Sequence, residues 1–384
     1  MRKKYIMAPG PTPIPAEVLA EAGMPIMHHR TPQFQAIFKD AHEGLKLFFR
    51  TKQPVMTFAS VGTGVMESAV ANMTSPGEKV LVAASGHFGN RWKDICQVFG
   101  VTAEHYESEW GKPVDPEEVR KRLKADPDIK LVFTTLNETS TGVVNDIQTL
   151  TKIAHESGAL IVVDAISGLG AMPCETDAWG VDLVLSGSQK GFMIPPGLAF
   201  VCAAPSAVEK TKTAKNPRYY FSYEKALKKL TEEKMPDTPF TPAISLVIQV
   251  RKALQLINEE GMDNVWKRHA GLAKATRAGV EAMGLKLFAP TAPSNALTAV
   301  ISPEGIDSGL VNKTFRDTYG ISIAGGQAKV KGKIFRIGHL GYVDGSDVIL
   351  GVATLEMVMH KLGKKVPLGV GVKAAQEILL AENL

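Results

Sequence analysis

The 384-residue chain is predicted to fold as an α/β domain, with a mainly parallel sheet sandwiched by helices, followed by a smaller α+β domain. Short apolar runs alternate with amphipathic stretches between residues 54 and 203, which favours a parallel sheet. Several runs are continuously apolar, as is typical of strands covered on both faces. From residue 243 long helical patterns come first, and only short strands follow. We therefore expect an N-terminal arm at 1–20, a large domain at 21–258 and a small domain at 259–384.

The elements follow from these patterns in chain order. The strands expected in the large sheet cover residues 54–60, 80–85, 129–136, 159–167, 182–188 and 198–203. Helical spacing between them predicts helices at 65–73, 88–99, 116–124 and 146–157. Residues 205–242, rich in Lys, Glu, Tyr and Pro, are expected to form connecting helix and loop. Beyond them we expect helices at 243–259, 263–283, 308–319 and 345–361, and strands at 296–302 and 333–341.

Composition excludes several classes of function. The chain is 45% hydrophobic and 22% charged, as in globular proteins, and its net charge of +5 is spread out, so a nucleic-acid partner is not expected. No apolar run approaches the roughly 18 residues that cross a bilayer, and prolines interrupt the basic N-terminal stretch, so we expect a cytoplasmic protein. Three cysteines without a CxxC pattern predict neither a disulfide framework nor a metal site.

Polar residues directly after the predicted strands are the candidates for chemistry, since open α/β sheets bind ligands beyond the carboxyl ends of their strands. After the first strand, Gly62, Thr63 and Gly64 lead into a helix, and backbone N–H groups with a hydroxyl at such a turn suit a phosphate. A simple turn is the alternative. A cluster of hydroxyls, 137-NETSTG, follows the third strand.

Asp164 and Lys190 follow the fourth and fifth strands, 26 residues apart. A carboxylate after so apolar a strand is costly unless it is paired, although Asp164 could instead cap a helix starting at Ile166. A lone lysine could reach solvent. Together, however, the pair and the phosphate-type turn match the needs of a pyridoxal phosphate enzyme. The lysine forms a Schiff base with the cofactor aldehyde, and the carboxylate keeps the pyridine nitrogen protonated.

Four stretches, 60-SVGTGVMES, 138-ETSTG, 186-SGSQKGFMIPPG and 335-FRIGHLG, resemble the class V, fold-type I aminotransferases, especially the alanine-glyoxylate and serine-glyoxylate (serine-pyruvate) group. The resemblance runs from 8-APGPTPIP to about residue 360. It implies pyridoxal 5'-phosphate as cofactor, held by a Lys190 Schiff base and paired with Asp164, and pyridoxamine phosphate after the first half-reaction. The implied activity moves the amino group of alanine or serine to a 2-oxo acid such as glyoxylate or pyruvate.

The resemblance also implies roles for further residues. The implied cofactor contacts are Gly62, Thr63, Gly64 and Gln189 near the phosphate, Phe88 on the ring face, Thr139 near the phenolic oxygen and Ile166 under the ring. Thr238 and Thr241 are expected to reach the phosphate of a neighbouring subunit, which implies a homodimer with shared sites. Arg336 is expected to clamp the substrate carboxylate. Without the resemblance, the alternative interpretations are a core residue for Phe88, a helix cap for Thr241 and an edge-strand residue paired with an acid for Arg336.

Other functions stay open at this point. Four further residues are candidate substrate-binding residues: His28, His29, Arg30 and Lys329. His28 stands where relatives typically have glycine, and Lys329 adds a cation a few residues before Arg336. We hypothesise that they receive a distal phosphate, which would make the protein a phosphoserine:2-oxoglutarate aminotransferase of serine biosynthesis. A lyase of the cysteine desulfurase kind is disfavoured, because no cysteine follows Cys202 and Gln189, not histidine, precedes Lys190. A non-enzymatic hydrogenase-associated subunit is disfavoured by the intact lysine, aspartate and arginine.

Overall fold

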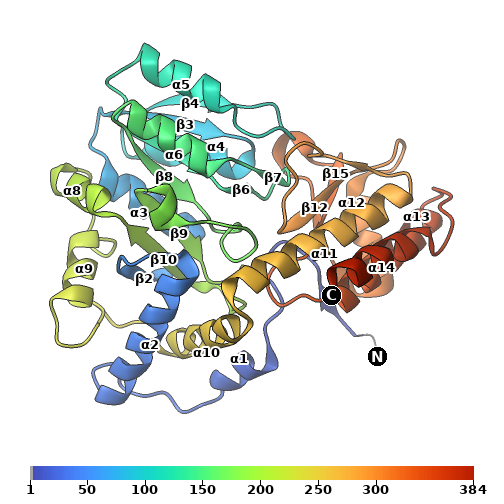
Figure 1. Cartoon of the computed structure of the whole chain (residues 1–384), viewed down its shortest axis with the longest axis horizontal. Helices are drawn as coiled ribbons and strands as arrows, with labels where there is room; N and C mark the ends of the chain where they lie inside the picture. Colours follow the sequence, from blue (N-terminus) through green and yellow to red (C-terminus); the bar gives the residue numbers. More distant parts are fainter. Residues whose placement is uncertain (1–2) are drawn as a thin grey trace.

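A seven-stranded sheet forms the larger part of the molecule (Figure 1), in a computed structural model that describes residues 3–384. The strand order is β2-β10-β9-β8-β5-β3-β4. Only β10 runs against its neighbours β2 and β9; the remaining pairs are parallel, which confirms the mainly parallel sheet. The strands are β2 (Val55–Ser60), β3 (Lys79–Ala84), β4 (Thr102–Glu107), β5 (Leu131–Thr135), β8 (Leu160–Asp164), β9 (Leu183–Gly187) and β10 (Gly197–Ala203).

Helices cover both faces of this sheet (Figure 1). They are α2 (Pro32–Phe49), α3 (Gly62–Met73), α4 (His87–Val98), α5 (Pro116–Ala125), α6 (Ile147–Glu156), α7 (Thr176–Trp179), α8 (Pro205–Thr213), α9 (Tyr223–Thr231) and α10 (Ile244–Glu260). Local caps fix some starts: the side chains of Asp115 and Asp146 accept hydrogen bonds from the first turns of α5 and α6. Because β5 and β9 are buried along their whole length, their continuous apolar sequences fit the observed packing.

Two elements of the large sheet and its covering layer differ from the sequence prediction. The edge strand β4 reads TAEHYE and is only partly buried, so it lacks the apolar run that marked the other strands. Helix α2 was not predicted, although its buried Phe34, Phe38, Leu45 and Phe48 lie at helical spacing. The Lys-rich region after β10 forms the helices α8 and α9 and a loop, as expected.

A smaller antiparallel sheet, of order β11-β12-β15-β14, lies beside the large sheet (Figure 1). Its strands are β11 (Lys286–Leu287), β12 (Leu297–Ile301), β14 (Ala324–Gly325) and β15 (Ile334–Gly338), and its helices are α11 (Met262–Ala282), α12 (Ser308–Thr314), α13 (Gly345–Lys361) and α14 (Val370–Glu382). Helix α12 continues as a π-helical turn, Phe315–Tyr319. This part has a second hydrophobic core, built around side chains such as Phe315, Phe335 and Leu355.

The N-terminal segment belongs structurally to this smaller part before it crosses to the large sheet (Figure 1). Strand β1 (Tyr5–Ile6) pairs in parallel with β13 (Ile321–Ser322), and α1 (Ala16–Glu21) contacts α10. A short hairpin of β6 (Asn137–Glu138) and β7 (Val143–Val144) follows β5. The division at residues 20 and 258 stays a prediction. Along the part of the chain that the structure describes, no helix combines the length and apolar content that crossing a membrane requires.

Candidate active site

A cavity of about 310 Å³ opens at the carboxyl ends of the parallel strands. Most of the predicted cofactor residues line it: Gly62, Thr63, Phe88, Thr139, Asp164, Ile166, Gln189 and Lys190. Val61, Arg91, Asn137 and Ser167 line it as well and were not predicted. Strand ends that lie far apart in the sequence thus converge on one site, as the topology of an open α/β sheet requires.

Lys190 lies just after β9 and points its amine into this cavity. The Nζ atom donates a hydrogen bond to the carbonyl oxygen of Pro9 at 2.7 Å. Burial and the nearby Arg336 guanidinium lower the pKa of Lys190 to about 8, while the Asp164 carboxyl opposes the shift. The amine therefore reaches its neutral, nucleophilic form much closer to neutral pH than an exposed lysine does.

Asp164 ends β8 and is 4% exposed. Its Oδ1 accepts a hydrogen bond from the Ile166 backbone at 2.8 Å, but residues 166–171 form turns and no helix begins there, so the helix-cap interpretation is wrong. Burial raises the pKa of Asp164 to about 7; the Ile166 hydrogen bond opposes the shift and Glu138 adds to it. A carboxyl in such a place needs a cationic or proton-donating partner to ionise fully.

The start of α3 forms the phosphate-type turn. Within residues 3–384 no side chain caps this helix, so its first N–H groups point to the cavity mouth without the usual partner. A Cβ on Gly62 would stand 2.4 Å from Ile166 Cδ1, and one on Gly64 would stand 2.1 Å from Ser60 Oγ. Thr63 Oγ1 accepts a hydrogen bond from Arg91 Nη1 at 2.9 Å. A side chain at either glycine would thus force Ile166 or Ser60 to shift, and the turn can cradle an anion.

Phe88 lines the cavity from the first turn of α4, where its backbone is fixed by Glu138. The Glu138 carboxylate accepts hydrogen bonds from the N–H groups of Phe88 at 3.2 Å and Gly89 at 2.8 Å. The Arg91 guanidinium lies 4.9 Å from the centre of the Phe88 ring. The sequence analysis did not single out Glu138, because it lies about 50 residues after the helix start that it caps and no local pattern indicates such a contact.

Thr139, which lines the cavity, and Arg336 of β15 join the two parts of the molecule. Thr139 Oγ1 hydrogen-bonds Ser167 Oγ at 2.5 Å, and its carbonyl oxygen accepts from Arg336 Nη1 at 2.7 Å. Arg336 Nε and Nη2 both donate to the Gly325 carbonyl, at 3.0 and 2.5 Å. Arg336 is 4% exposed, and burial lowers its pKa to about 10, opposed by Glu138. Its hydrogen-bond partners are carbonyls, not the acid that the edge-strand interpretation expected.

The guanidinium of Arg336 carries five N–H donors, one on Nε and two on each terminal nitrogen. The three hydrogen bonds to carbonyls use one donor on each nitrogen, so one donor remains on each terminal nitrogen. One donor on each terminal nitrogen is what a bidentate contact with a carboxylate requires.

None of the five predicted substrate-binding residues lines this cavity, and of these Arg336 alone is bonded, among the described residues, to one that does, Thr139. Arg30 forms an ion pair with Asp237 and donates to the Thr238 carbonyl at 3.1 Å. Lys329 Nζ lies 2.5 Å from the Glu107 carboxylate, on the β4 edge. His28 and His29 lie beside each other, with ring centres 4.8 Å apart and ring planes tilted by 33°. Within one chain Arg30 and Lys329 are therefore paired with acids away from the cavity.

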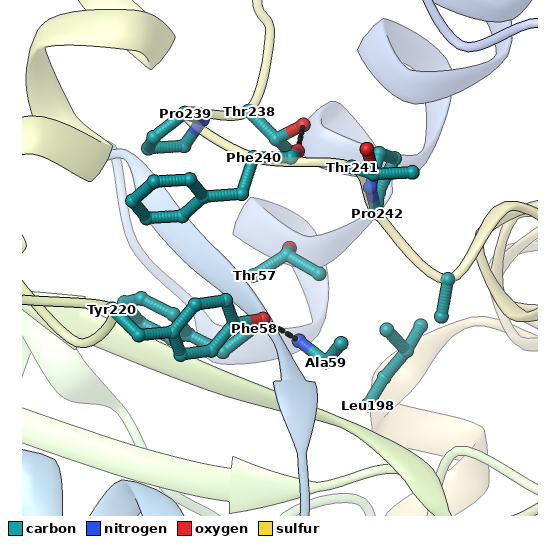
Figure 2. Close-up of a pocket in the computed structure, with 11 residues that line it drawn as sticks. Thr57, Phe58, Ala59, Leu198, Tyr220, Thr238, Pro239, Phe240, Thr241 and Pro242 are labelled. Carbon is teal, nitrogen blue, oxygen red and sulfur yellow. Dashed lines mark hydrogen bonds between the residues drawn. The ribbon is translucent and has the colours of Figure 1, made fainter.

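Thr238 and Thr241 line a different, aromatic pocket with Phe58, Tyr220 and Phe240 (Figure 2). Thr238 Oγ1 donates to the Phe240 carbonyl at 2.7 Å, and Tyr220 Oη accepts from the Ala59 backbone at 3.0 Å. Figure 2 shows the 238–242 loop running above the end of β2. The two threonines do not meet Lys190 within one chain, so their predicted role in a partner's site stays a prediction.

The fold and the converging residues define an α/β enzyme of fold type I, with a buried lysine and a buried carboxyl at adjacent strand ends. The model of the family described as aminotransferase class-V matches residues 5–342, and the chain belongs to this family. It is an aminotransferase, as predicted. Members of this class in general depend on pyridoxal 5'-phosphate.

Several known proteins are similar over nearly the whole chain. The soluble hydrogenase 42 kDa subunit of Anabaena cylindrica is 42% identical and covers 98% of both chains. The L-aspartate--glyoxylate aminotransferase of Paracoccus denitrificans is 41% identical, over 97% of this chain and 95% of that one. The serine--glyoxylate aminotransferase of Hyphomicrobium methylovorum is 40% identical, over 97% and 94%. Among solved structures, ureidoglycine-glyoxylate aminotransferase of Bacillus subtilis superposes with a TM-score of 0.93 at 27% identity, covering 99% of both chains.

Proposed function

We propose that the protein is a pyridoxal 5'-phosphate-dependent transaminase that moves the amino group of a small L-amino acid, alanine or serine, to glyoxylate or a similar 2-oxo acid. The convergence of Lys190 and Asp164 on one cavity carries this proposal, together with Arg336, which donates to the carbonyl of the cavity residue Thr139 and acts electrostatically on Lys190. The similar proteins named for glyoxylate as acceptor support it.

The residues that line the cavity fit the cofactor. The uncapped start of α3 offers N–H groups to a phosphate, and two buried side-chain oxygens, Gln189 Oε1 and Asn137 Oδ1, are left without a partner among the described residues. Buried polar atoms are rarely left so unless a ligand engages them. We assign the phosphate to Gly62, Thr63 and the side-chain amide of Gln189, which would donate through its nitrogen. We assign the ring face to Phe88, the opposite face to Ile166, the phenolic oxygen to Thr139 and the aldehyde to Lys190. When bound, the cofactor supplies an electron-accepting ring that stabilises negative charge at the substrate carbon.

The chain's own residues then perform four tasks. The fork of Arg336 holds the substrate carboxylate and so fixes the orientation of the bonds at the adjacent carbon. Lys190 Nζ takes the proton from that carbon as a base and would then deliver it, as an acid, to the cofactor carbon that carried the aldehyde. Asp164 uses the oxygen that Ile166 leaves free to accept a hydrogen bond from the ring nitrogen, which keeps that nitrogen protonated. Burial of all three side chains excludes water from the reacting atoms.

The low pKa of Lys190 suits the first proton transfer. An amine with a pKa of about 8 is partly neutral at physiological pH, whereas an ordinary lysine is almost entirely protonated. A base poised near the working pH combines a sufficient neutral fraction with adequate proton affinity.

We also propose that the active unit is a homodimer in the cytoplasm, with Thr238 and Thr241 completing the phosphate site of the partner. The ion pair between Arg30 and Asp237 fixes the loop that carries both threonines. A complementation experiment tests shared sites: mixed and refolded Lys190→Ala and Thr238→Ala/Thr241→Ala proteins should regain activity through hybrid dimers with one intact site. Activity no higher than the sum of the separate variants contradicts shared sites.

The phosphoserine alternative has less support from the geometry, because Arg30 and Lys329 are paired with acids and neither lines the cavity. Two similar proteins are named as soluble hydrogenase subunits, but a non-enzymatic subunit does not require a buried lysine, carboxyl and arginine so close together. The first of these alternatives therefore needs phosphoserine as a test substrate, and the second needs a test for turnover.

A half-reaction screen tests the proposed function. The yellow holoenzyme is mixed separately with L-alanine, L-serine, L-aspartate, L-phosphoserine and L-glutamate, and the loss of cofactor absorbance is followed. Rapid bleaching by alanine or serine, reversed by glyoxylate, is the expected result. Bleaching by phosphoserine and glutamate alone overturns the proposed substrates, and no bleaching by any donor overturns the proposed transaminase.

A further inference from the structure

An N-terminal strap, residues 7–12, runs from β15, the strand that carries Arg336, to the segment that carries Lys190. On one side, Gly338 of β15 donates to the Met7 carbonyl at 2.6 Å, and Met7 donates to Ser322 at 2.8 Å. On the other side, Thr12 donates from its backbone to the Gln189 carbonyl at 3.2 Å and from Oγ1 to the Lys190 carbonyl at 3.0 Å. The strap thus ties the strand of Arg336 to the segment of Lys190.

Between these two anchors the strap presents the Pro9 carbonyl oxygen to the lysine amine, 2.7 Å from Nζ. It is the hydrogen-bond partner that the structure gives this amine. Pro9 and Thr12 are buried, so the amine meets a fixed protein group there in place of mobile water.

Gly10, the next residue, makes this contact possible. Its φ of 122° is one that L side chains rarely adopt. A Cβ at this position would stand 2.3 Å from Lys190 Nζ and 2.5 Å from its Cδ, so the lysine side chain occupies the space that any other residue would fill.

We propose that the strap is a positioning element for the proton transfers: the Pro9 carbonyl holds the Lys190 amine whenever that amine is not bonded to the cofactor. This inference rests on the role proposed for Lys190. The strap acts on the reaction through the lysine and does not touch the reacting carbon.

The chemistry of a carbonyl suits this task. A neutral amine donates one N–H to a carbonyl and keeps its lone pair free to accept the substrate proton. After the transfer the ammonium still donates to the same oxygen, so the contact persists through both steps. A carboxylate in the same place would hold the amine protonated. The charged groups that act on the amine are Arg336, which lowers its pKa, and Asp164, which raises it.

The substitution Gly10→Ala tests the inference, because its methyl group must displace the lysine from Pro9. The matched control is Gly77→Ala: Gly77 also has a positive φ, of 81°, but a Cβ there has nothing within 4 Å, and the residue is exposed in the turn before β3. Both variants thus carry backbone strain, and only one moves the lysine.

Three measurements are made on each holoenzyme in a single half-reaction with L-serine or L-alanine. For Gly10→Ala we expect the rate to fall by about 10²-fold, the scale of a misplacement of about 1 Å, and the isotope effect with the α-deuterated amino acid to rise. The acidic limb of the pH–rate profile should move to lower pH, because losing the carbonyl destabilises the ammonium. Gly77→Ala should stay within about twofold of wild type, since it leaves the site unchanged.

A milder variant, Thr12→Val, keeps Gly10 and removes only the hydrogen bond to the Lys190 carbonyl. It should show the same direction of change at about a tenth of wild-type rate, and it is decisive if Gly10→Ala does not fold. Rate, isotope effect and pH limb equal to those of Gly77→Ala in the folded variants overturn the strap's role. If wild type itself shows no half-reaction, the proposed function has failed instead.

Discussion

Asp164→Asn should stabilise the protein stripped of its cofactor, although it should disable the enzyme. In the empty site burial raises the pKa of Asp164 from 3.8 to about 7. Asparagine keeps the acceptor for Ile166 and nearly the same volume, but it carries no charge. Removing a buried group that resists ionisation should therefore relieve a cost that the fold bears at neutral pH.

The sign and the pH window follow from linkage. Between pH 3.8 and about 7 the folded protein holds the Asp164 proton and the unfolded chain releases it. The free energy of unfolding of wild type thus falls as pH rises through this window, relative to that of the variant. At about 1.4 kcal/mol for each pKa unit, the shift in the pKa of Asp164 corresponds to at most about 4 kcal/mol. Above pH 7 we expect the free energy of unfolding of the variant to exceed that of wild type by about 2 to 4 kcal/mol.

Urea unfolding of both apoproteins, followed by tryptophan fluorescence at equal subunit concentration from pH 4 to pH 8, measures this difference. It should be near zero at pH 4, grow with pH and level off above about pH 7. Asp128→Asn, at an exposed carboxyl, is the control and should stay within about 0.5 kcal/mol of wild type throughout. A difference that is independent of pH, or a wild type that gains stability relative to the variant as pH rises, refutes the reasoning.

Three further predictions concern single contacts of the site. Arg336→Lys keeps the charge but loses the bidentate contact, so kcat/KM for both amino acid and oxo acid should fall by about 10- to 150-fold in steady-state assays, the loss of about 1.5–3 kcal/mol expected for a charge-assisted hydrogen bond. An unchanged kcat/KM contradicts the carboxylate role. Glu138→Gln places an amide against the N–H groups of Phe88 and Gly89 and should lower the free energy of unfolding by about 1–3 kcal/mol, measured in urea; equal midpoints would speak against the capping role. Lys329→Ala removes an ion pair whose lysine is 61% exposed, so it should change the free energy of unfolding by less than about 1 kcal/mol and leave the rate of the alanine half-reaction unaltered. A large loss of rate would instead support a role for Lys329 in substrate binding.

The large sheet and the cofactor cavity could be predicted because their signals are local. Continuously apolar runs mark buried parallel strands, and the residues that follow them must meet at one edge of the sheet. Asp164 and Lys190 were found for that reason, and the structure brings them to one cavity with Phe88 and Gly62.

What the sequence did not reveal depends on contacts between distant segments. Glu138 acts on the start of α4, about 50 residues earlier in the chain, and no periodicity indicates such a cap. The strap lies against Lys190 through contacts that span about 180 residues. The edge strand β4 has no apolar run because one of its sides pairs with nothing in the sheet. Lys329 resembled a site residue by its distance from Arg336 along the chain, yet its carboxylate partner is on that edge strand.

Borohydride reduction of the holoenzyme, followed by proteolysis and mass spectrometry, tests the central claim most directly, since it fixes the cofactor to whichever amine carries it. We predict that the added mass lies on the peptide containing Lys190, and that Lys190→Ala protein gains no such mass on any peptide. Attachment to another lysine in wild type, or none at all, would contradict the assignment of Lys190 and with it the chemistry proposed for the cavity.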